Sequence, residues 1–280
     1  MIQDMKILRF GSTGRIAKIT QRAFEALFLK PDIYTYQRNG GYLHELTNTF
    51  YSNLEKCSTS WGSSKIVFVD TSIDHSNINS LIEHENLKHK VILWLAEKKI
   101  LYKAIGFSSG ITLIDKNSIS PIADQMLAYR EKKIIQEDYF SSLDCQFYLP
   151  NIFTLIGPAT YSRQAAAWAQ VLSARLKSAT NFKINEPYSK RLWVSEKFLF
   201  ISLLHFLRNQ SNSNVTGPLV QGSFTLDQIA NIDLEICIPP LKYLNNKKNG
   251  WLLGDYTTEN LHDSTLTGSI NSVLFESMYH

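Results

Sequence analysis

The sequence has few cysteines, and they are widely spaced. Cys57, Cys145 and Cys237 are the only three in 280 residues, and neither a CxxC pair nor a nearby histidine completes a metal-binding set. An odd number of cysteines at such spacings is unlike the disulfide framework of a small secreted protein. We therefore predict a reduced, cytoplasmic protein without a metal site.

Long runs of one residue type are also missing. The 29 Lys and Arg residues exceed the 25 Asp and Glu residues by four, and no block of like charges indicates a nucleic-acid partner. The longest apolar stretch, 198–207, has about half of the roughly 20 residues that a membrane-spanning helix needs. Charges at Asp4, Lys6 and Arg9 interrupt the first ten residues, which is unlike the apolar core of a signal peptide. We expect no membrane segment.

What the sequence does have is an alternation of short apolar runs with helical patterns. The run 65–69 (KIVFV) is apolar without alternation, as in a strand that is buried on both faces. Strands are expected at 6–10, 32–36, 65–69, 102–108 and 146–149, and helices at 16–28, 41–55, 86–98 and 123–137. This order predicts an α/β protein with a Rossmann-type, doubly wound parallel sheet.

The pattern becomes less regular after Gly157 and Pro158. We expect a helix at 163–176, a strand at 191–194 and a helix at 196–207. The predicted organisation is therefore a main domain at 1–157 and a smaller C-terminal α+β lobe at 158–280. In this organisation, some segments of 158–280 can belong to the first domain.

A glycine-containing turn, GSTGRIA, separates the first expected strand from the first expected helix. Glycines let the backbone approach a pyrophosphate, and the N-terminus of a helix offers N–H groups and a partial positive charge. A tight turn without a ligand is the alternative, and the position after the first strand favours phosphate binding. The candidate residues are Gly11, Ser12, Thr13, Gly14, Arg15 and Ile16.

The end of the second expected strand bears on which dinucleotide would bind. An acidic residue there would hydrogen-bond the ribose hydroxyls of NAD, whereas an arginine accommodates the 2′-phosphate of NADP. The sequence has Gln37 and Arg38 at this place, and Arg15 lies in the glycine turn. We predict NADP, with NAD as the alternative if both arginines are solvated surface residues.

Tyr129 and Lys133 are four residues apart and would share one face of a helix. A lysine ammonium beside a phenol would lower the pKa of the phenol toward neutrality and make it a proton donor and acceptor. Tyr243 and Lys247 repeat the spacing in a polar, turn-rich stretch, where a surface pair is the better explanation. The Tyr129 pair differs because a strand ending in hydroxyl residues precedes it.

Taken together, these segments resemble the extended short-chain dehydrogenase/reductase family, in the branch that acts largely on nucleotide sugars. The resemblance covers most of the chain. It is carried by GSTGRIA at 11–17, Asn86, FSSGITLID at 107–115, YREKK at 129–133, LPNIFTLIGP at 149–158 and GSFTLDQIA at 222–230. In the last of these the resemblance implies a loop at 222–226 that leads into a helix. It implies an NAD(P)-binding domain at 1–157, a substrate-binding lobe at 158–280 and, as in many relatives, a homodimer.

The resemblance also implies roles for single residues. Tyr129 would be the catalytic acid or base, Lys133 would lower its pKa and hold the nicotinamide ribose, and Asn86 would order a proton-relay water. Asp70 would contact adenosine through its backbone. Nicotinamide and sugar would be bordered by Pro150 and Asn151, and the substrate diphosphate would be approached by Arg191 or its neighbour Lys190.

One position departs from the family pattern. The family has Ser or Thr where the alignment puts Gly110, so Ser109 replaces the hydroxyl, or Thr112 does, or it is absent. Ser109, Thr112 and Tyr129 would also contact the substrate. Loss of such a preorganised hydrogen bond lowers the rate by on the order of 10²-fold or more. Dehydratases of the family carry an Asp-Glu pair directly afterwards, whereas this chain has Ile111 and Thr112, which disfavours a dehydratase.

The function expected from these observations is reduction of a nucleoside-diphosphate keto sugar by NADPH, in the synthesis of polysaccharide precursors. A 4-epimerase of the same family is the nearest alternative and would use the same groups without net consumption of cofactor. A non-catalytic, dinucleotide-binding member of the family is the second alternative, motivated by Gly110. A scaffold protein without a cofactor is the third.

Overall fold

The computed structural model describes residues 5–11, 14–27, 32–36, 65–72, 78–113, 124–157, 188, 190–208 and 213–230. The expected helices at 41–55 and 163–176, and the candidate site residues Ser12, Thr13 and Arg38, lie outside these ranges. The chain divides into two compact units, Met1–Asn151 with Leu203–Gly217, and Ile152–Ser202 with Pro218–His280. The first break between the units lies at 151/152, six residues before the expected boundary, and the segment 203–217 belongs with the first unit.

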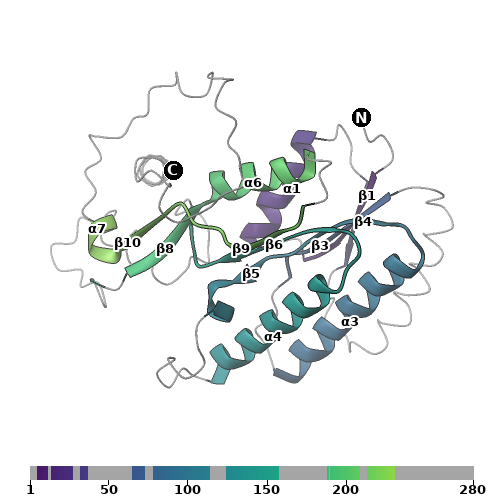
Figure 1. Cartoon of the computed structure of the whole chain (residues 1–280), viewed down its shortest axis with the longest axis horizontal. Coiled ribbons are helices and arrows are strands. Elements are labelled where there is room, and N and C mark those ends of the chain that lie inside the picture. Colours follow the sequence, from purple (N-terminus) through teal and green to yellow (C-terminus); the bar gives the residue numbers. More distant parts are fainter. Residues whose placement is uncertain are drawn as a thin grey trace. The chain divides into compact units, whose positions relative to one another are not determined.

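The first unit is built on a parallel sheet (Figure 1). Its strands run in the order β2-β1-β3-β4-β6-β5, and β9 also pairs with β6. The pairs β1–β2, β1–β3, β3–β4 and β4–β6 are parallel. The strands are β1 (Met5–Phe10), β2 (Asp32–Tyr36), β3 (Lys65–Asp70), β4 (Leu101–Ile105), β5 (Ser108–Ser109), β6 (Gln146–Ile152) and β9 (Val215–Pro218). The predicted Rossmann-type sheet is confirmed.

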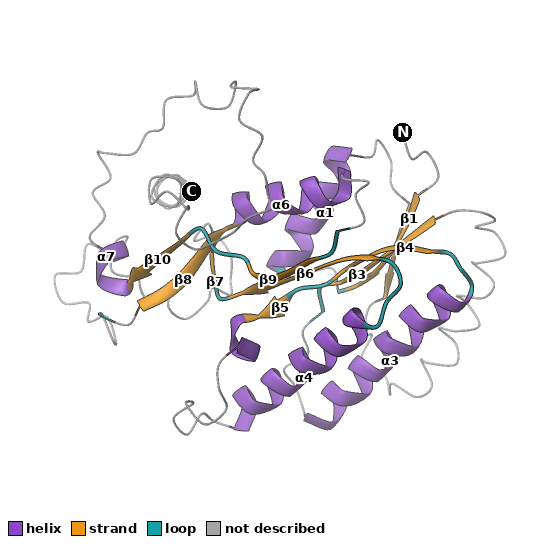
Figure 2. Cartoon of the chain, viewed as in Figure 1, coloured by secondary structure: helices purple, strands orange, loops and turns teal. Residues whose placement is uncertain are grey.

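Helices cover both faces of this sheet (Figure 2). On one face lies α1 (Arg15–Leu27), which buries Ala17, Ile19, Ala23 and Phe24. On the other face α3 (Ile78–Glu97) and α4 (Asp124–Ser141) lie side by side. Helix α3 begins earlier than the expected 86, and α4 continues past 137 because Tyr139 and Phe140 are buried in its last turn.

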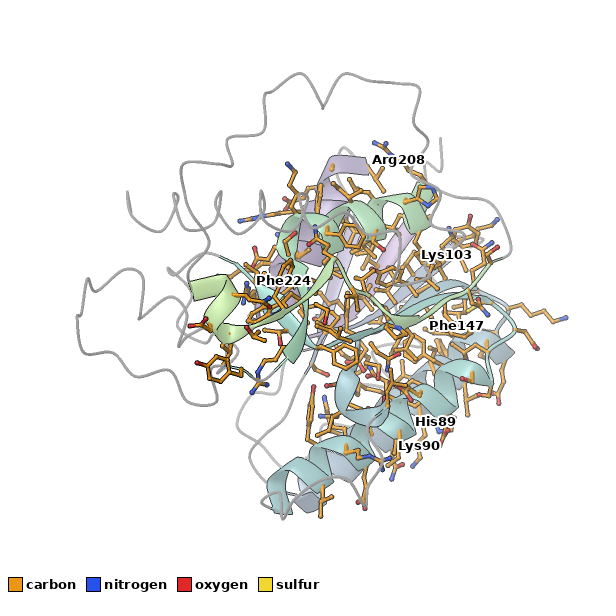
Figure 3. The ribbon with its side chains drawn as sticks, turned by 60° about the vertical axis from the view of Figure 1, so that its left-hand side comes forward. His89, Lys90, Lys103, Phe147, Arg208 and Phe224 are labelled. Carbon is orange, nitrogen blue, oxygen red and sulfur yellow. The ribbon has the colours of Figure 1, made fainter. Side chains whose placement is uncertain are left out.

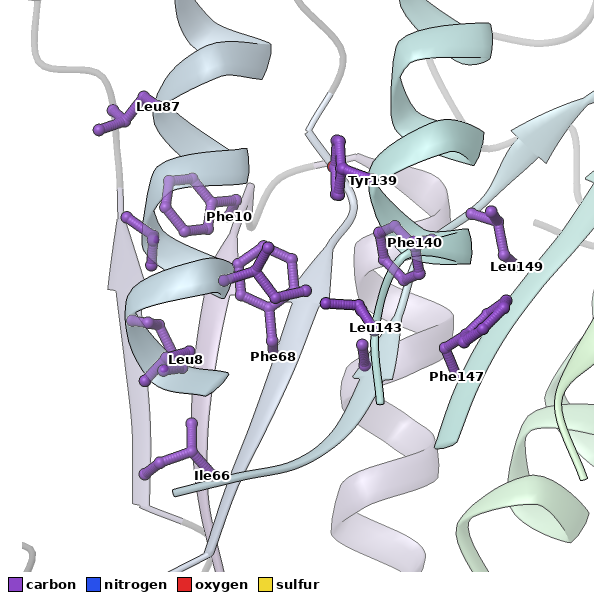
Figure 4. Packing of buried hydrophobic residues seen from close by; sticks show 14 residues of the cluster. Leu8, Phe10, Ile66, Phe68, Leu87, Tyr139, Phe140, Leu143, Phe147 and Leu149 are labelled. Carbon is purple, nitrogen blue, oxygen red and sulfur yellow. The ribbon is translucent and has the colours of Figure 1, made fainter. Parts of the chain in front are cut away.

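A large hydrophobic cluster of the first unit lies between the sheet and the pair α3 and α4 (Figure 4). Phe68 of β3 stands between Phe10 and Phe140, with ring centroids 5.6 and 6.4 Å away. The expected strand 102–108 is divided at Gly106, where an added Cβ would lie 2.7 Å from the Phe140 ring. A glycine there lets α4 pack closely against the sheet.

A buried lysine binds the C-terminal end of α6 (Glu196–Arg208). Lys103 of β4 (labelled in Figure 3) donates a hydrogen bond from Nζ to the carbonyl oxygen of Phe206, at 2.8 Å. Its Nζ lies 4.7 Å from the centre of the Phe206 ring. A cation is favourable here because the last carbonyl groups of a helix lack intrahelical partners. Burial lowers the pKa of Lys103 from 10.5 to about 8.

The second unit contains a three-stranded sheet with the order β10-β8-β7. Its strands are β7 (Thr154–Ile156), β8 (Lys190–Ser195) and β10 (Gly222–Thr225), followed by α7 (Leu226–Ala230). The sequence predicted β8 and α6 to within two residues, but the segment expected as a loop at 222–226 forms β10 and pairs antiparallel with β8. None of the described helices is long and apolar enough to cross a bilayer.

Candidate functional site

The glycine turn begins where β1 and β3 end beside each other. Gly11 has a φ of +83°, and an added Cβ would lie 2.9 Å from the Cα and N atoms of Ser72. Thr71 fixes this approach through its N–H, which donates to the carbonyl oxygen of Phe10 at 2.9 Å. Both the left-handed backbone and the lack of space require glycine at this position.

Helix α1 starts directly behind the turn. The N–H of Lys18 donates to the carbonyl oxygen of Gly14 at 3.1 Å, and Arg15 and Ile16, in the first turn of the helix, are half-buried. An added Cβ on Gly14 would meet no atom within 4 Å. The N-terminus of α1 directly follows a glycine with open space around it. This arrangement fits the predicted pyrophosphate site, because the first N–H groups of a helix have no intrahelical acceptor.

Three predicted catalytic residues, Tyr129, Ser109 and Lys133, lie close together. The side chains of Tyr129, on α4, and Ser109, in β5, are hydrogen-bonded to each other. The Lys133 Nζ lies 5.9 Å from the centre of the Tyr129 ring and donates to the carbonyl oxygen of Phe107 at 2.6 Å. Of the two candidate hydroxyls, the one bonded to Tyr129 is that of Ser109.

The electrostatics of this group differ from the sequence-based expectation. Burial raises the pKa of Tyr129 above 10.0, and the hydrogen bond with Ser109 opposes this only in part. Lys133 is not among the causes of this shift, so its effect on the phenol pKa stays a prediction. Lys133 interacts with Phe107 and Gln136, and burial lowers its own pKa from 10.5 to about 8.

Thr112 and Asn151, both predicted to contact substrate, are held by a carboxylate that the sequence analysis missed. Glu137 Oε1 accepts hydrogen bonds from Thr112 Oγ1 and Asn151 Nδ2, each at 2.8 Å, and from the Ser108 hydroxyl. The sequence signal for Glu137 was its spacing, because it follows Lys133 by four residues on the face that carries Tyr129. Pro150, next to Asn151, is buried in β6.

A buried ionic network surrounds Asp70, the last residue of β3. The Asp70 carboxylate accepts hydrogen bonds through Oδ2 from Lys88 Nζ and Gln136 Nε2, each at 2.6 Å, and from the Tyr139 hydroxyl at 3.2 Å. Its Oδ1 accepts from the N–H and the hydroxyl of Ser72 at 3.1 and 2.9 Å. The Asp70 side chain is thus bound within the protein, which leaves only the predicted backbone role toward adenosine.

Helix α3 supplies the charges that compensate Asp70. Burial alone would raise the pKa of Asp70, but the ammonium groups of Lys88 and Lys133 and the hydrogen bonds lower it well below 3.8. Lys88 also pairs with Glu85 at 2.7 Å, and Lys132 of α4 pairs with Glu85 at 3.1 Å. These side chains are nearly inaccessible to solvent, which excludes a surface ion pair.

Two further predicted site residues are not part of this cluster. Asn86 is exposed on α3, whereas Glu85 and Lys88 on the same helix are buried. This exposure disfavours the predicted role of Asn86 in ordering a buried water. Arg191 lies half-buried in β8 of the second unit, opposite Phe224 in the β10 register. Among the residues that the structure describes, no group of three or more His, Cys, Asp or Glu could hold a metal ion.

Solved structures share this architecture. A GDP-D-glycero-L-gluco-heptose synthase from Campylobacter jejuni with NADPH has 11% identity and a TM-score of 0.56, over 82% of this chain and 84% of that chain. A GDP-L-fucose synthetase from Naegleria fowleri has 15% identity and a TM-score of 0.57, over 82% and 76%. This is the fold of the extended short-chain dehydrogenases/reductases.

Other enzymes with the same fold also match. The Bordetella bronchiseptica enzyme WbmG, in complex with NAD and UDP, has 12% identity and a TM-score of 0.57, over 82% of this chain and 77% of that chain. No protein-family model and no curated protein matches the sequence. At these identities the extended short-chain dehydrogenase/reductase fold is shared, and the activity has to be argued from the site.

Proposed function

We propose that the protein is an NADPH-dependent reductase of a keto sugar carried on a nucleoside diphosphate. One observation carries this proposal: the Tyr129 side chain is hydrogen-bonded to Ser109, with the Lys133 Nζ 5.9 Å from its ring, on an extended short-chain dehydrogenase/reductase fold. A hydroxyl and an ammonium beside a phenol can orient a substrate carbonyl and support proton transfer to its oxygen.

The protonation state of Tyr129 in the protein without ligand suits reduction. Because burial raises its pKa above 10.0, the phenol keeps its proton at neutral pH. A reductase needs this form, since Tyr129 must give a proton to the carbonyl oxygen. A 4-epimerase begins by taking a proton from a sugar hydroxyl and would need the phenolate first.

The residues around the glycine turn fit a nicotinamide dinucleotide, which would supply the hydride when bound. Gly11 and Gly14 would let the backbone approach the pyrophosphate. Lys133 uses two of its three N–H donors on Phe107 and Gln136, so one donor is left for a ribose hydroxyl. Arg15 and Arg38 are the residues proposed to select the 2′-phosphate. Structures with this fold were determined with NADPH and with NAD.

The first test is a fluorescence titration of the purified protein with NADPH and, in parallel, NADH. We expect micromolar affinity with a preference for NADPH, and Arg15→Ala and Arg38→Ala should each reduce this preference. A preference for NADH would contradict the roles of both arginines. If neither dinucleotide binds and the purified protein carries none, the proposed function is wrong.

The second test uses a panel of nucleoside-diphosphate keto sugars. We expect NADPH to be consumed in a one-to-one ratio with one of these substrates, whereas an epimerase would interconvert sugars without net consumption. Tyr129→Phe should abolish turnover while the affinity for NADPH and the thermal stability stay unchanged. A Tyr129→Phe variant with full turnover would exclude Tyr129 as the proton donor.

A further inference from the structure

Lys133 donates hydrogen bonds to one backbone carbonyl group and to one side-chain amide. Its Nζ donates to the carbonyl oxygen of Phe107, two residues before Ser109, at 2.6 Å. It also donates to Gln136 Oε1 at 2.9 Å. Both Lys133 and Gln136 are nearly inaccessible to solvent, at 4% and 1% exposure, so no bulk water competes for these bonds.

The side-chain amide of Gln136 connects Lys133 to the carboxylate of Asp70 on β3. Its Nε2 donates to Asp70 Oδ2 at 2.6 Å, at the end of β3. An ammonium can only donate and an ionised carboxylate can only accept, so only one orientation of the amide satisfies both neighbours. The chain of bonds from Asp70 through Gln136 to Lys133 therefore has a fixed direction.

We propose that Gln136 and Asp70 are positioning residues that hold the Lys133 ammonium beside Tyr129. This inference rests on the proposed function for its catalytic meaning. The amide separates Lys133 from Asp70, while Lys88 forms the direct ion pair with Asp70 at 2.6 Å. A direct ion pair between Asp70 and Lys133 would instead draw the ammonium away from Tyr129 toward β3.

The charges around Lys133 come from three elements. Burial lowers the pKa of Lys133 most, and the carboxylates of Asp70 on β3, Glu85 on α3 and Glu137 on α4 raise it, whereas the Lys88 ammonium on α3 lowers it. An acceptor that binds the charged form raises the pKa of an amine. Removing the Gln136 acceptor should thus make Lys133 easier to deprotonate.

The structure offers a matched control. The Tyr139 hydroxyl donates to the same oxygen of Asp70, at 3.2 Å, from the same helix, and it also contacts the Gln136 side chain, but it does not bond to Lys133. Tyr139→Phe and Gln136→Met each remove one hydrogen bond to Asp70 Oδ2. Only Gln136→Met also removes one of the two acceptors of Lys133.

The test is an NMR titration of protein labelled with ¹³C-lysine, in which Lys133→Arg assigns the Lys133 signal. We expect Gln136→Met to lower the apparent pKa of Lys133 by about one unit, a roughly tenfold loss of proton affinity. Tyr139→Phe should shift it by less than about a third of that. Gln136→Glu, which keeps an acceptor, should hold the pKa at or above the wild-type value.

Equal shifts in Gln136→Met and Tyr139→Phe, or no shift in Gln136→Met, would overturn the proposal. If Gln136→Met does not fold by circular dichroism, Gln136→Asn, whose amide is too short to reach both neighbours, has the same expected result. With an identified substrate, Gln136→Met should lower kcat and leave the sugar KM unchanged. The titration needs no dinucleotide, so its outcome is separate from a failure of NADPH binding.

Discussion

The hydroxyl of Thr71 donates a hydrogen bond to the carbonyl oxygen of Gly11, 2.9 Å away. This bond joins the ends of two adjacent parallel strands, β1 and β3, at the place where the chain turns into α1. The glycine turn is therefore built by two segments that are about sixty residues apart in the sequence. Its shape does not depend on local conformation alone.

Gly11 and Gly14 should respond differently to the same substitution. Gly11→Ala should lower the free energy of unfolding by about 2 kcal/mol or more, because φ is positive and the Cβ would contact the Ser72 backbone. Gly14→Ala has space and should change stability by less than about 0.5 kcal/mol, yet weaken NADPH binding at the turn. Urea unfolding and dinucleotide titration of both variants measure this. Equal stability losses would refute the distinction.

The two candidate hydroxyls can be separated by substitution. Ser109→Ala should lower kcat by on the order of 10²-fold, because it removes the group bonded to Tyr129. Thr112→Val should mainly lower stability, since Thr112 bonds to Glu137 and to the Ser109 carbonyl oxygen. The measurements are steady-state kinetics with the identified keto sugar and thermal unfolding. A larger kcat loss in Thr112→Val would assign the catalytic hydroxyl to Thr112.

Asp70 should make the protein sensitive to acid. Its folded-state pKa lies below the ordinary 3.8, so the stabilisation is complete above about pH 4 and is lost as the pH falls further. Asp70→Asn should lower the free energy of unfolding by about 3–5 kcal/mol at pH 7, because Lys88 loses one of its two buried carboxylate partners, and by less at pH 3. Denaturant unfolding at both values measures the difference. Asp138→Asn, an exposed change on α4, should have little effect at either pH.

Lys103 should change the stability of the protein at alkaline pH, whereas Asp70 changes it at acid pH. Its pKa is about 8 in the folded protein and ordinarily 10.5, so between these values the unfolded chain binds more protons and stability rises with pH. Relative to Lys103→Met, the wild type should gain about 1–2 kcal/mol between pH 7 and pH 10. Urea unfolding of both proteins at the two pH values measures this gain. A constant difference between them would show that Lys103 titrates normally.

The sequence predicts the sheet well because its strands are short apolar runs between turn residues. The expected strand 32–36 coincides with β2, and the helical spacing of Tyr129 and Lys133 places them correctly on one helix. By contrast, β10 was expected as a loop, since its partner β8 is about thirty residues earlier and local composition does not reveal that pairing. Strand pairing at such distances is a tertiary property.

The sequence predicts which residues form the candidate site better than it predicts their hydrogen-bond partners and pKa values. Alignment by register left Ser109, Thr112 or no hydroxyl as open options, and only the fold brings Ser109 to Tyr129. The links from Asp70 to Lys88 and Gln136 join residues 18 and 66 positions apart, for which the sequence has no periodic signal. The pKa of Tyr129 depends on burial, which a spacing of four residues does not report.

The pairing of β9 with β6 has a consequence for synthesis on the ribosome. The Phe147 N–H donates to Asn214 Oδ1 at 3.0 Å, and the rings of Tyr148 and Phe206 lie 5.4 Å apart, so β6 is completed by residues made much later. A nascent chain that ends at residue 151 would expose an unfinished strand and its apolar side chains. The first unit therefore cannot complete its sheet until residues 203–217 have been synthesised.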